Sequence, residues 1–346
     1  RENGPGLYSY SPEFALTDGG KRRRTGVLAA LRLEEFSSGI IRPHERTFEG
    51  AKKDRLELLR SCQTHLSPIF CLYARKEWSL AQVAKSALAQ PPLVSLVDDK
   101  DVTHQVWNVT DPTVIAEVAK GLERESLIIA DGHHRYEVSC TYRDLMREKL
   151  GTQFTGEEDF NFCLAYFTNT DYRGLSILPI HRLLKLETRL DLDDFMAKGK
   201  EYFDVDQLKD RTRFFFLLEK AGCAEHLLGL YKDKKYFLLR LKNVKILDKL
   251  IADKPKEYRV LDVAILNYLV FKNILNLDLN NLAAIKYSPD PYELMDQVDS
   301  DPLNVAFFLN PVKIPQIISI ATSGNKMPPK STFFYPKVLS GLVINK

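Results

Sequence analysis

The stretch that decides the fold is Ser126-Leu127-Ile128-Ile129-Ala130-Asp131-Gly132-His133-His134-Arg135-Tyr136. Residues 126–130 form a short apolar run of the kind found in buried strands, and a helical pattern of apolar residues runs from Tyr136 to Gly151. A strand that ends in Asp-Gly and opens directly into a helix brings backbone N–H groups and the positive end of the helix dipole to one point. The turn is therefore a candidate seat for a phosphate group.

Predicted strands and helices alternate around this stretch, which indicates an α/β (α+β) fold with a mixed sheet. The predicted strands are 26–33, 67–73, a hairpin of 93–97 with 102–109, and 160–168, and the predicted helices are 51–59 and 112–124. Asp111 and Pro112 predict the start of the second helix, because Asp caps helices and Pro suits the first turn.

A chain of 346 residues predicts two lobes, because single cores stop growing near roughly 250 residues. We expect a core at residues 1–186 and a smaller α+β lobe at 187–346, from which the C-terminal segment could return to the core. Elements expected in the second lobe are helices at 192–203, 210–221, 261–275 and 292–298, a hairpin of 226–231 with 235–241, and a strand at 305–309. The chain starts at Arg1 without methionine or a signal pattern, so we expect upstream residues to be missing.

Composition limits the class of protein. A net charge of +3 is nearly neutral for this length, so it does not favour nucleic-acid binding, and no apolar run approaches the roughly 20 residues that cross a bilayer. The five cysteines form no CxxC pair and lie within apolar or helical patterns, which indicates reduced core residues. We therefore expect a cytoplasmic protein. The cysteines are Cys62, Cys71, Cys140, Cys163 and Cys223.

The residues of the turn suit phosphate chemistry. A guanidinium such as that of Arg135 can hold phosphate oxygens by two parallel hydrogen bonds, and Asp131 could hold a metal or accept a proton. The structural alternative is an N-cap aspartate, a turn glycine and surface histidines. Two adjacent histidines followed by an arginine favour the functional interpretation.

Three further groups of polar residues are candidates. In the loop at His44-Glu45-Arg46, Glu45 could act as a base and Arg46 as a phosphate contact, but a solvated charged loop explains the same residues. His181 is followed by arginine, and Lys330 lies in a proline-containing tail at 326–337 that cannot be helical. The alternative for His181 is a structural role in a strand, and the alternative for Lys330 is structural packing of the loop. A zinc site built from the histidines is not supported by any metal-ligand spacing.

These motifs resemble a family of bacterial and archaeal proteins, the domain-of-unknown-function family numbered 1015. The resemblance rests on the stretches 42–47 with 51–60, 67–70, 129–137, 178–182 and 327–342, which span almost the whole chain. Members usually carry an additional N-terminal segment with a Pro-Pro-Tyr-Asp stretch, which this sequence lacks.

The turn also resembles the nucleotide-phosphate loop of the ParB and sulfiredoxin superfamily, which includes free-serine kinases that make O-phosphoserine. This resemblance implies a ParB/sulfiredoxin-like core and carries the role of phosphate contact onto His133, His134 and Arg135. It assigns no position to the kinase glutamate, so Glu45 is chosen for its chemistry.

The resulting hypothesis is a nucleotide-dependent phosphotransferase that acts on a small hydroxyl metabolite such as free serine, with ATP or ADP and Mg²⁺. Arg135 and His134 would clamp the phosphates, Asp131 would hold the metal directly or through water, and Glu45 would take the hydroxyl proton. The remaining predicted contacts are His44, Arg46, Gly132, His133, His181 and Lys330. The alternative is a nucleotide-binding regulator resembling ParB without kinase activity, whose second lobe engages DNA or protein.

Overall fold

The computed structural model describes residues 6–16, 19–47, 49–74, 80, 88–171, 174–221, 225–279 and 285–346. The chain divides into two compact units. Unit 1 comprises residues 1–176 and 334–346, and unit 2 comprises residues 177–333. The prediction ended the first lobe at residue 186, whereas the strand at His181–Lys185 belongs to the sheet of unit 2.

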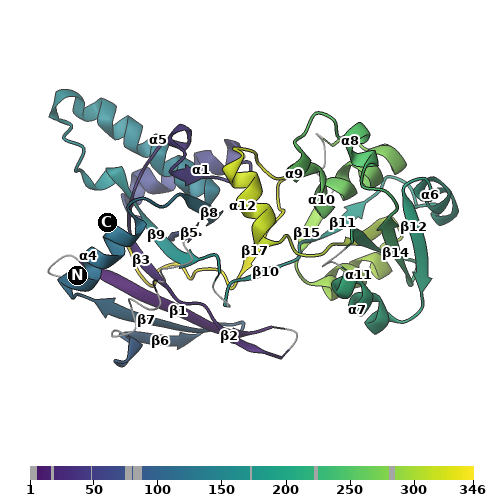
Figure 1. Cartoon of the computed structure of the whole chain (residues 1–346), viewed down its shortest axis with the longest axis horizontal. Helices are drawn as coiled ribbons and strands as arrows, with labels where there is room; N and C mark the ends of the chain where they lie inside the picture. Colours follow the sequence, from purple (N-terminus) through teal and green to yellow (C-terminus); the bar gives the residue numbers. More distant parts are fainter. Residues whose placement is uncertain are drawn as a thin grey trace. The chain divides into compact units, whose positions relative to one another are not determined.

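In the described part of unit 1 the strands form one nine-stranded mixed sheet. Its order is β4-β8-β5-β9-β3-β1-β7-β6, with β2 paired to β1 (Figure 1). The β4–β8 and β5–β9 pairs are parallel and the other pairs are antiparallel. The strands are β1 (Leu7–Ala15), β2 (Lys21–Arg23), β3 (Gly26–Arg32), β4 (Ile41–Arg42), β5 (Ile69–Tyr73), β6 (Val94–Val97), β7 (Thr103–Val109), β8 (Leu127–Asp131) and β9 (Phe162–Asn169).

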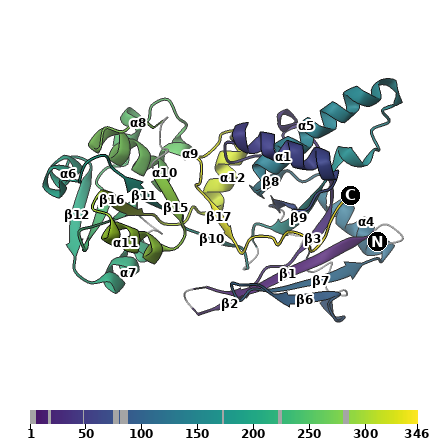
Figure 2. The same ribbon diagram turned by 180° about the vertical axis from the view of Figure 1, so that it is seen from behind.

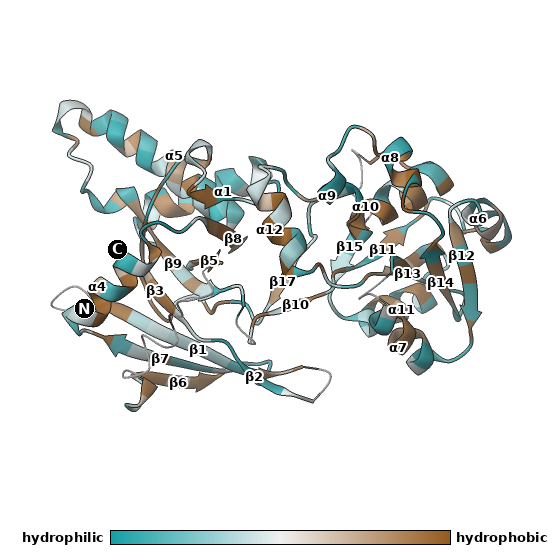
Figure 3. Cartoon of the chain, viewed as in Figure 1, coloured by the Kyte–Doolittle hydropathy of each residue, from teal (hydrophilic) through white to brown (hydrophobic). Residues whose placement is uncertain are grey.

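The helices of unit 1 are α1 (Glu49–Cys62), α4 (Pro112–Leu122) and α5 (His133–Leu150), with single turns η1 (Phe36–Ser38), η2 (Gly151–Gln153) and η3 (Asp159–Asn161). Helices α1 and α5 lie side by side (Figures 1 and 2). The first half of α5 places Tyr136 in the apolar core with Ile69 and Ile129, and its second half is mostly exposed and hydrophilic (Figure 3). Packing therefore fixes the beginning of α5, where the predicted phosphate seat lies.

The predicted strand-turn-helix is present, since β8 ends at Asp131 and α5 begins at His133. The predicted cap of α4 is confirmed as well, because the Asp111 carboxylate accepts a hydrogen bond from the Thr113 N–H at 2.8 Å. The α/β prediction is thus confirmed.

Within the described residues of unit 2, the strands form a six-stranded antiparallel sheet in the order β12-β14-β13-β16-β11-β15. These strands are β11 (His181–Lys185), β12 (Phe203–Leu208), β13 (Leu227–Lys232), β14 (Lys235–Leu241), β15 (Ile285–Ser288) and β16 (Asn304–Phe308). Two further short strands, β10 (Ser176–Leu178) and β17 (Phe333–Tyr335), lie at the two points where the chain passes from one unit to the other. The helices are α6 (Leu192–Gly199), α7 (Arg211–Ala221), α8 (Ile246–Leu250), α9 (Lys256–Arg259), α10 (Asp262–Ile265), the π-helix η4 (Leu266–Ile274), α11 (Pro291–Ser300) and α12 (Ile314–Thr322).

Neighbouring residues of β16 show how helices cover both faces of this sheet. Successive side chains of a strand point to opposite faces. Phe308 contacts Phe214 of α7 with ring centroids 5.8 Å apart, and Phe307 contacts Phe271 of η4 at 5.3 Å. Both phenylalanines of β16 are fully buried. Unit 2 is therefore a helix-sheet-helix sandwich.

Two predicted helices of unit 2 differ from the structure: one ends earlier, and the other changes from an α-helix to a π-helix. The helix predicted at 192–203 ends at Gly199, and Phe203 begins β12 instead. The helix predicted at 261–275 is a short α-helix that continues as η4. Strand β15 had not been predicted.

Four of the five cysteines lie in the described part of the chain and are free thiols. Cys71 and Cys163 are buried, Cys62 and Cys140 are partly buried, and Cys223 lies outside the described residues. Across the described residues, no helix is both long and apolar enough to span a membrane.

Candidate phosphate-binding site

The turn before α5 requires glycine. Gly132 is the N-cap of α5 with a φ of 98°, in the left-handed region, and its carbonyl accepts the first helical bond from the Tyr136 N–H at 2.9 Å. A Cβ at Gly132 would lie 2.9 Å from the Arg135 guanidinium. Gly132, and not Asp131, therefore occupies the N-cap position of α5.

The Asp131 carboxylate lies between two cations. Its Oδ2 accepts a hydrogen bond from Arg135 at 2.9 Å, and its Oδ1 accepts one from the Lys337 ammonium at 2.5 Å. Burial lowers the pKa of Arg135, while the charge of Asp131 opposes that shift. A guanidinium stays protonated in proteins, so these three side chains carry one net positive charge.

A small cavity of about 60 Å³ lies beside Arg135, between α1 and α5. Its charged lining residues are Arg55 and Arg135, and Thr64 and Ser67 add hydroxyl groups. No carboxylate is among the described residues that line it. An anion in this cavity would lie beside two arginines, of which Arg135 is already paired with Asp131.

The loop that carries Glu45 is tethered to β8 and α5 on both sides of this residue. On one side, the His44 N–H donates to His133 Nε2 at 3.3 Å, and His44 Nδ1 donates to the Ile129 carbonyl at 2.7 Å. On the other side, the Thr47 hydroxyl donates to Glu137 at 2.7 Å. Glu45 is half-buried, and Arg46 is exposed. The structure thus brings this loop to the turn that the sequence had singled out.

Two of the predicted contacts are buried histidines. His44 is fully buried, and burial lowers its pKa to about 4, so the ring is neutral at pH 7. His133 is 7% exposed and its Nε2 already accepts the hydrogen bond from His44. These placements indicate that His44 anchors its loop to β8 and to the turn. His134, in contrast, is half-buried.

The two remaining candidates, His181 and Lys330, belong to unit 2. His181 on β11 is 4% exposed, and its Nδ1 accepts a hydrogen bond from the Leu309 N–H at 3.2 Å. Lys330 has an exposed side chain, and its carbonyl accepts a hydrogen bond from Arg182 at 2.9 Å. The geometry gives His181 a structural contact in its own unit.

We expect His181 to make the chain less stable in acid. Burial, and then the charge of Arg182, lower the pKa of His181 to about 3, below the 6.5 of a free imidazole. The unfolded chain takes up a proton below pH 6.5 and the folded chain does not, so stability falls with pH between these two values. The expected loss is about 1.4 kcal/mol per pH unit. In urea unfolding between pH 7 and 4, His181→Asn should flatten this dependence of stability on pH, because asparagine does not titrate. Its amide oxygen can still accept the hydrogen bond from the Leu309 N–H. An unchanged slope would contradict the assignment.

Lys337 was not identified from the sequence as a site residue, although it lies in the tail that was singled out. The segment after β17 holds Lys337 in place through backbone contacts. Arg24 donates to the Pro336 carbonyl at 2.8 Å, and the Gly341 N–H donates to the Leu66 carbonyl at 2.9 Å. The sequence around Lys337 gave no signal that this lysine pairs with Asp131.

The described residues contain no group of three or more His, Cys, Asp or Glu side chains placed to hold a metal ion. Magnesium in nucleotide sites takes one or two carboxylates, and phosphates and waters supply its other ligands. Asp131 fits that limited role by its chemistry, but a metal there would compete with Arg135 and Lys337 for the carboxylate oxygens.

Residues 1–264 match the family described as "Protein of unknown function (DUF1015)". The match covers more than half of the chain, so the chain belongs to this family. The resemblance found in the sequence motifs is thereby confirmed, whereas the link to the ParB and sulfiredoxin superfamily stays a prediction. Among curated proteins, no sequence matches the chain.

Three solved structures are weakly similar. A conserved hypothetical protein from Pyrococcus furiosus has 11% identity and a TM-score of 0.40, with 91% of this chain and 93% of that chain covered. A free serine kinase mutant in complex with ADP has 10% identity and a TM-score of 0.41, with 89% and 87% covered. SbnI with a C-terminal truncation, from Staphylococcus aureus, has 9% identity and a TM-score of 0.42, with 90% and 85% covered. Likenesses this weak do not bear on the activity of the chain.

Proposed function

We propose that the protein is a nucleotide-dependent phosphotransferase that acts on a small hydroxyl metabolite, with free serine as the first acceptor to test. The observation that carries the proposal is the placement of Arg135. It lies in the first turn of α5 and lines, with Arg55, the small cavity free of lining carboxylates. We propose that these two arginines, together with the nearby N-terminus of α5, favour the binding of a phosphate group.

The ion cluster of Asp131, Arg135 and Lys337 supports the same proposal. Asp131 orients both cations, and the surplus positive charge remains for the ligand. Phosphoryl transfer depends mainly on positioning and on neutralising the charge of the transferred group. Asp131 would hold magnesium directly or through water, and the ion would help to neutralise the charge of the phosphates.

Glu45 is the proposed base. The tethers at His44 and Thr47 hold its loop against β8 and α5, which supports the proposal that Glu45 acts near the turn. A carboxylate that accepts the proton of an attacking hydroxyl is the remaining chemical requirement of transfer. His134 and Arg46 are proposed to contribute polar contacts, since neither is fully buried.

The experiment is thermal-shift screening of the full chain against ATP, ADP, CTP and pyrophosphate with Mg²⁺, followed by transfer to L-serine detected by ³¹P NMR. Stabilisation with transfer supports the proposal. Stabilisation without transfer to any hydroxyl acceptor replaces it with the nucleotide-binding regulator, which needs the phosphate seat but no base. No stabilisation by any nucleotide refutes both.

Arg135→Met is expected to weaken nucleotide binding about 10- to 150-fold, because a lost charge-assisted contact costs about 1.5–3 kcal/mol. Titration calorimetry measures this loss directly. Arg147→Met is the matched control, since Arg147 is an exposed arginine in the last turn of the same helix, where its guanidinium lies 4.9 Å from the Phe154 ring centroid. Equal affinities of the two variants would remove Arg135 from the site.

A further inference from the structure

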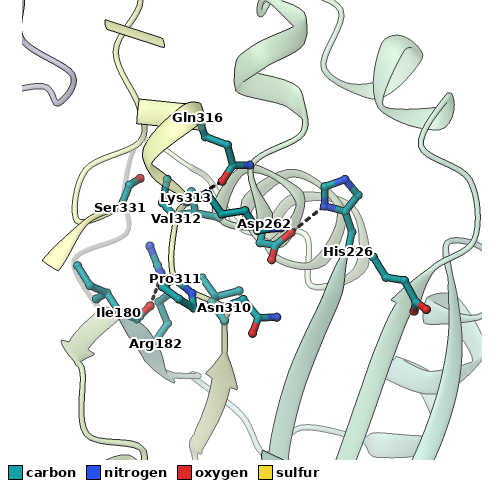
Figure 4. Close-up of a pocket in the computed structure, with 13 residues that line it drawn as sticks. Ile180, Arg182, His226, Asp262, Asn310, Pro311, Val312, Lys313, Gln316 and Ser331 are labelled. Carbon is teal, nitrogen blue, oxygen red and sulfur yellow. Dashed lines mark hydrogen bonds and ion pairs between the residues drawn. The ribbon is translucent and has the colours of Figure 1, made fainter. Parts of the chain in front are cut away.

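Unit 2 contains a cavity of about 220 Å³ that plays no part in the proposed nucleotide site. It is built from the start of β11, the residues just before β13, the start of α10 and the segment that joins β16 to α12 (Figure 4). Pockets for drug-sized ligands are usually roughly 300–1,000 Å³. The volume therefore suits a metabolite with few heavy atoms.

A buried cation forms one part of the lining. Arg182 is 2% exposed, and its guanidinium donates to the Lys330 carbonyl at 2.9 Å and to the Ile180 carbonyl. The guanidinium also lies 5.6 Å from the ring centroid of Tyr287. These contacts fix the position of the positive charge before any ligand arrives, which lowers the cost of binding an anion.

A positioned carboxylate forms another part of the lining. Asp262 accepts a hydrogen bond from His226 Nδ1 at 2.8 Å. Asp262 begins α10 and His226 precedes β13, and Figure 4 shows both side chains at the cavity. A carboxylate only accepts, so His226 Nδ1 carries the hydrogen. Among the described residues, His226 is the one group that hydrogen-bonds to the Asp262 carboxylate. Since this bond occupies one oxygen, the other can accept a hydrogen bond from a ligand.

The lining carries both signs of charge in equal number. Arg182 and Lys313 are positive, and Asp262 and Glu225 are negative, although Glu225 also pairs with Arg240 at 2.5 Å. A phosphate or a dicarboxylate would meet the carboxylates, and a polyamine would meet the guanidinium. A small ligand that carries one ammonium and one carboxylate suits this lining. Its carboxylate can contact Arg182 and its ammonium can contact Asp262, so each charge of the ligand meets an opposite charge.

We propose that this cavity binds a small free amino acid, with the ligand carboxylate on Arg182 and the ligand ammonium on Asp262, which His226 positions. The proposal goes beyond phosphotransfer and rests on residues of unit 2 alone. Failure of the nucleotide experiments would leave it standing, and its own failure would leave the phosphate seat standing.

The first test is titration calorimetry of the full chain with each of the twenty amino acids, and with analogues that lack one charge. For an amino acid that binds, we expect the N-acetyl form and the matching amine without a carboxylate to bind at least about tenfold more weakly. Inorganic phosphate is included as a purely anionic probe. Binding of phosphate or of a single-charge analogue as tightly as the amino acid would overturn the proposal, as would no binding of any amino acid at 10 mM.

Asp262→Asn separates the recognition of the ammonium group from a folding defect. Its amide oxygen can still accept from His226, while the negative charge is gone. We expect the amino acid to lose at least about tenfold in affinity relative to its N-acetyl form, measured on the same variant. That ratio is insensitive to a lowered stability of the variant.

His226→Gln is a second variant that leaves the Asp262 charge in place and removes the imidazole that positions it. We expect a smaller change of the same ratio. Asp248→Asn is the control, because Asp248 of α8 is an exposed carboxylate that pairs with Arg259 of α9 at 2.8 Å. An unchanged ratio in Asp262→Asn would refute the assignment of the ammonium contact.

Discussion

Glu45→Gln is expected to slow phosphoryl transfer by about 10²- to 10⁴-fold while nucleotide affinity stays unchanged. Glutamine keeps the size and the hydrogen-bonding oxygen of glutamate but cannot accept the proton of the attacking hydroxyl. The tethers at His44 and Thr47 stay in place in this variant and hold the loop against β8 and α5. Steady-state transfer to the acceptor and calorimetric titration with ADP are the two measurements.

The matched control for Glu45→Gln is Glu49→Gln. Glu49 is a 90% exposed carboxylate in the first turn of α1, four residues further along the chain, and pairs with Lys52. We expect this variant to transfer at the wild-type rate. If Glu45→Gln also transferred at that rate, the general base would have to be another group.

Gly26→Ala is expected to destabilise unit 1 by about 3 kcal/mol or more, because overpacking of a rigid core forces the backbone to move. A Cβ at Gly26 on β3 would lie 2.2 Å from the Phe167 carbonyl oxygen of β9 and 2.6 Å from the Tyr166 ring. The carbonyl belongs to the neighbouring strand of the sheet and cannot turn aside as a flexible side chain would. Urea unfolding measures the loss as a lower midpoint.

Gly50→Ala is the opposite case in the same unit. Gly50 is exposed in α1, and no described heavy atom lies within 4 Å of the position its Cβ would take. Alanine favours a helix over glycine by up to about 1 kcal/mol, so this variant should be neutral or more stable. Equal destabilisation by both variants would show that the close approach of β9 to Gly26 does not decide the effect.

The strand-turn-helix around Asp131 could be predicted because its signals are local. The apolar run before Asp131, the glycine after it and the helical pattern from Tyr136 lie within a short stretch of chain. The error at β12 is of a different kind. Phe203 was added to the preceding helix, although the alternation of apolar and polar residues from Phe203 to Asp206 matches the strand that the structure contains. There the period of the pattern was misread.

The partners of the site could not be predicted in the same way. Asp131 and Lys337 are separated by 206 residues, and nothing in the local sequence distinguishes Lys337 from Lys330. His44 and His181 fit the pattern of ligand-binding residues in sequence, but both are buried and contact backbone groups. Burial depends on the packing of the whole unit, which a motif does not contain. The roles of Glu45, His134 and Arg46 stay predictions.

The return of residues 334–346 to unit 1 sets an order of events during translation. All of unit 2 lies between Asp131 and Lys337 in the sequence. At about 5–20 residues per second, the ribosome needs roughly 10 to 40 s to make the intervening chain. Throughout this interval the nascent chain contains Asp131 and Arg135 without Lys337. A growing polypeptide therefore contains the proposed phosphate seat without one of its cations until unit 2 has been synthesised.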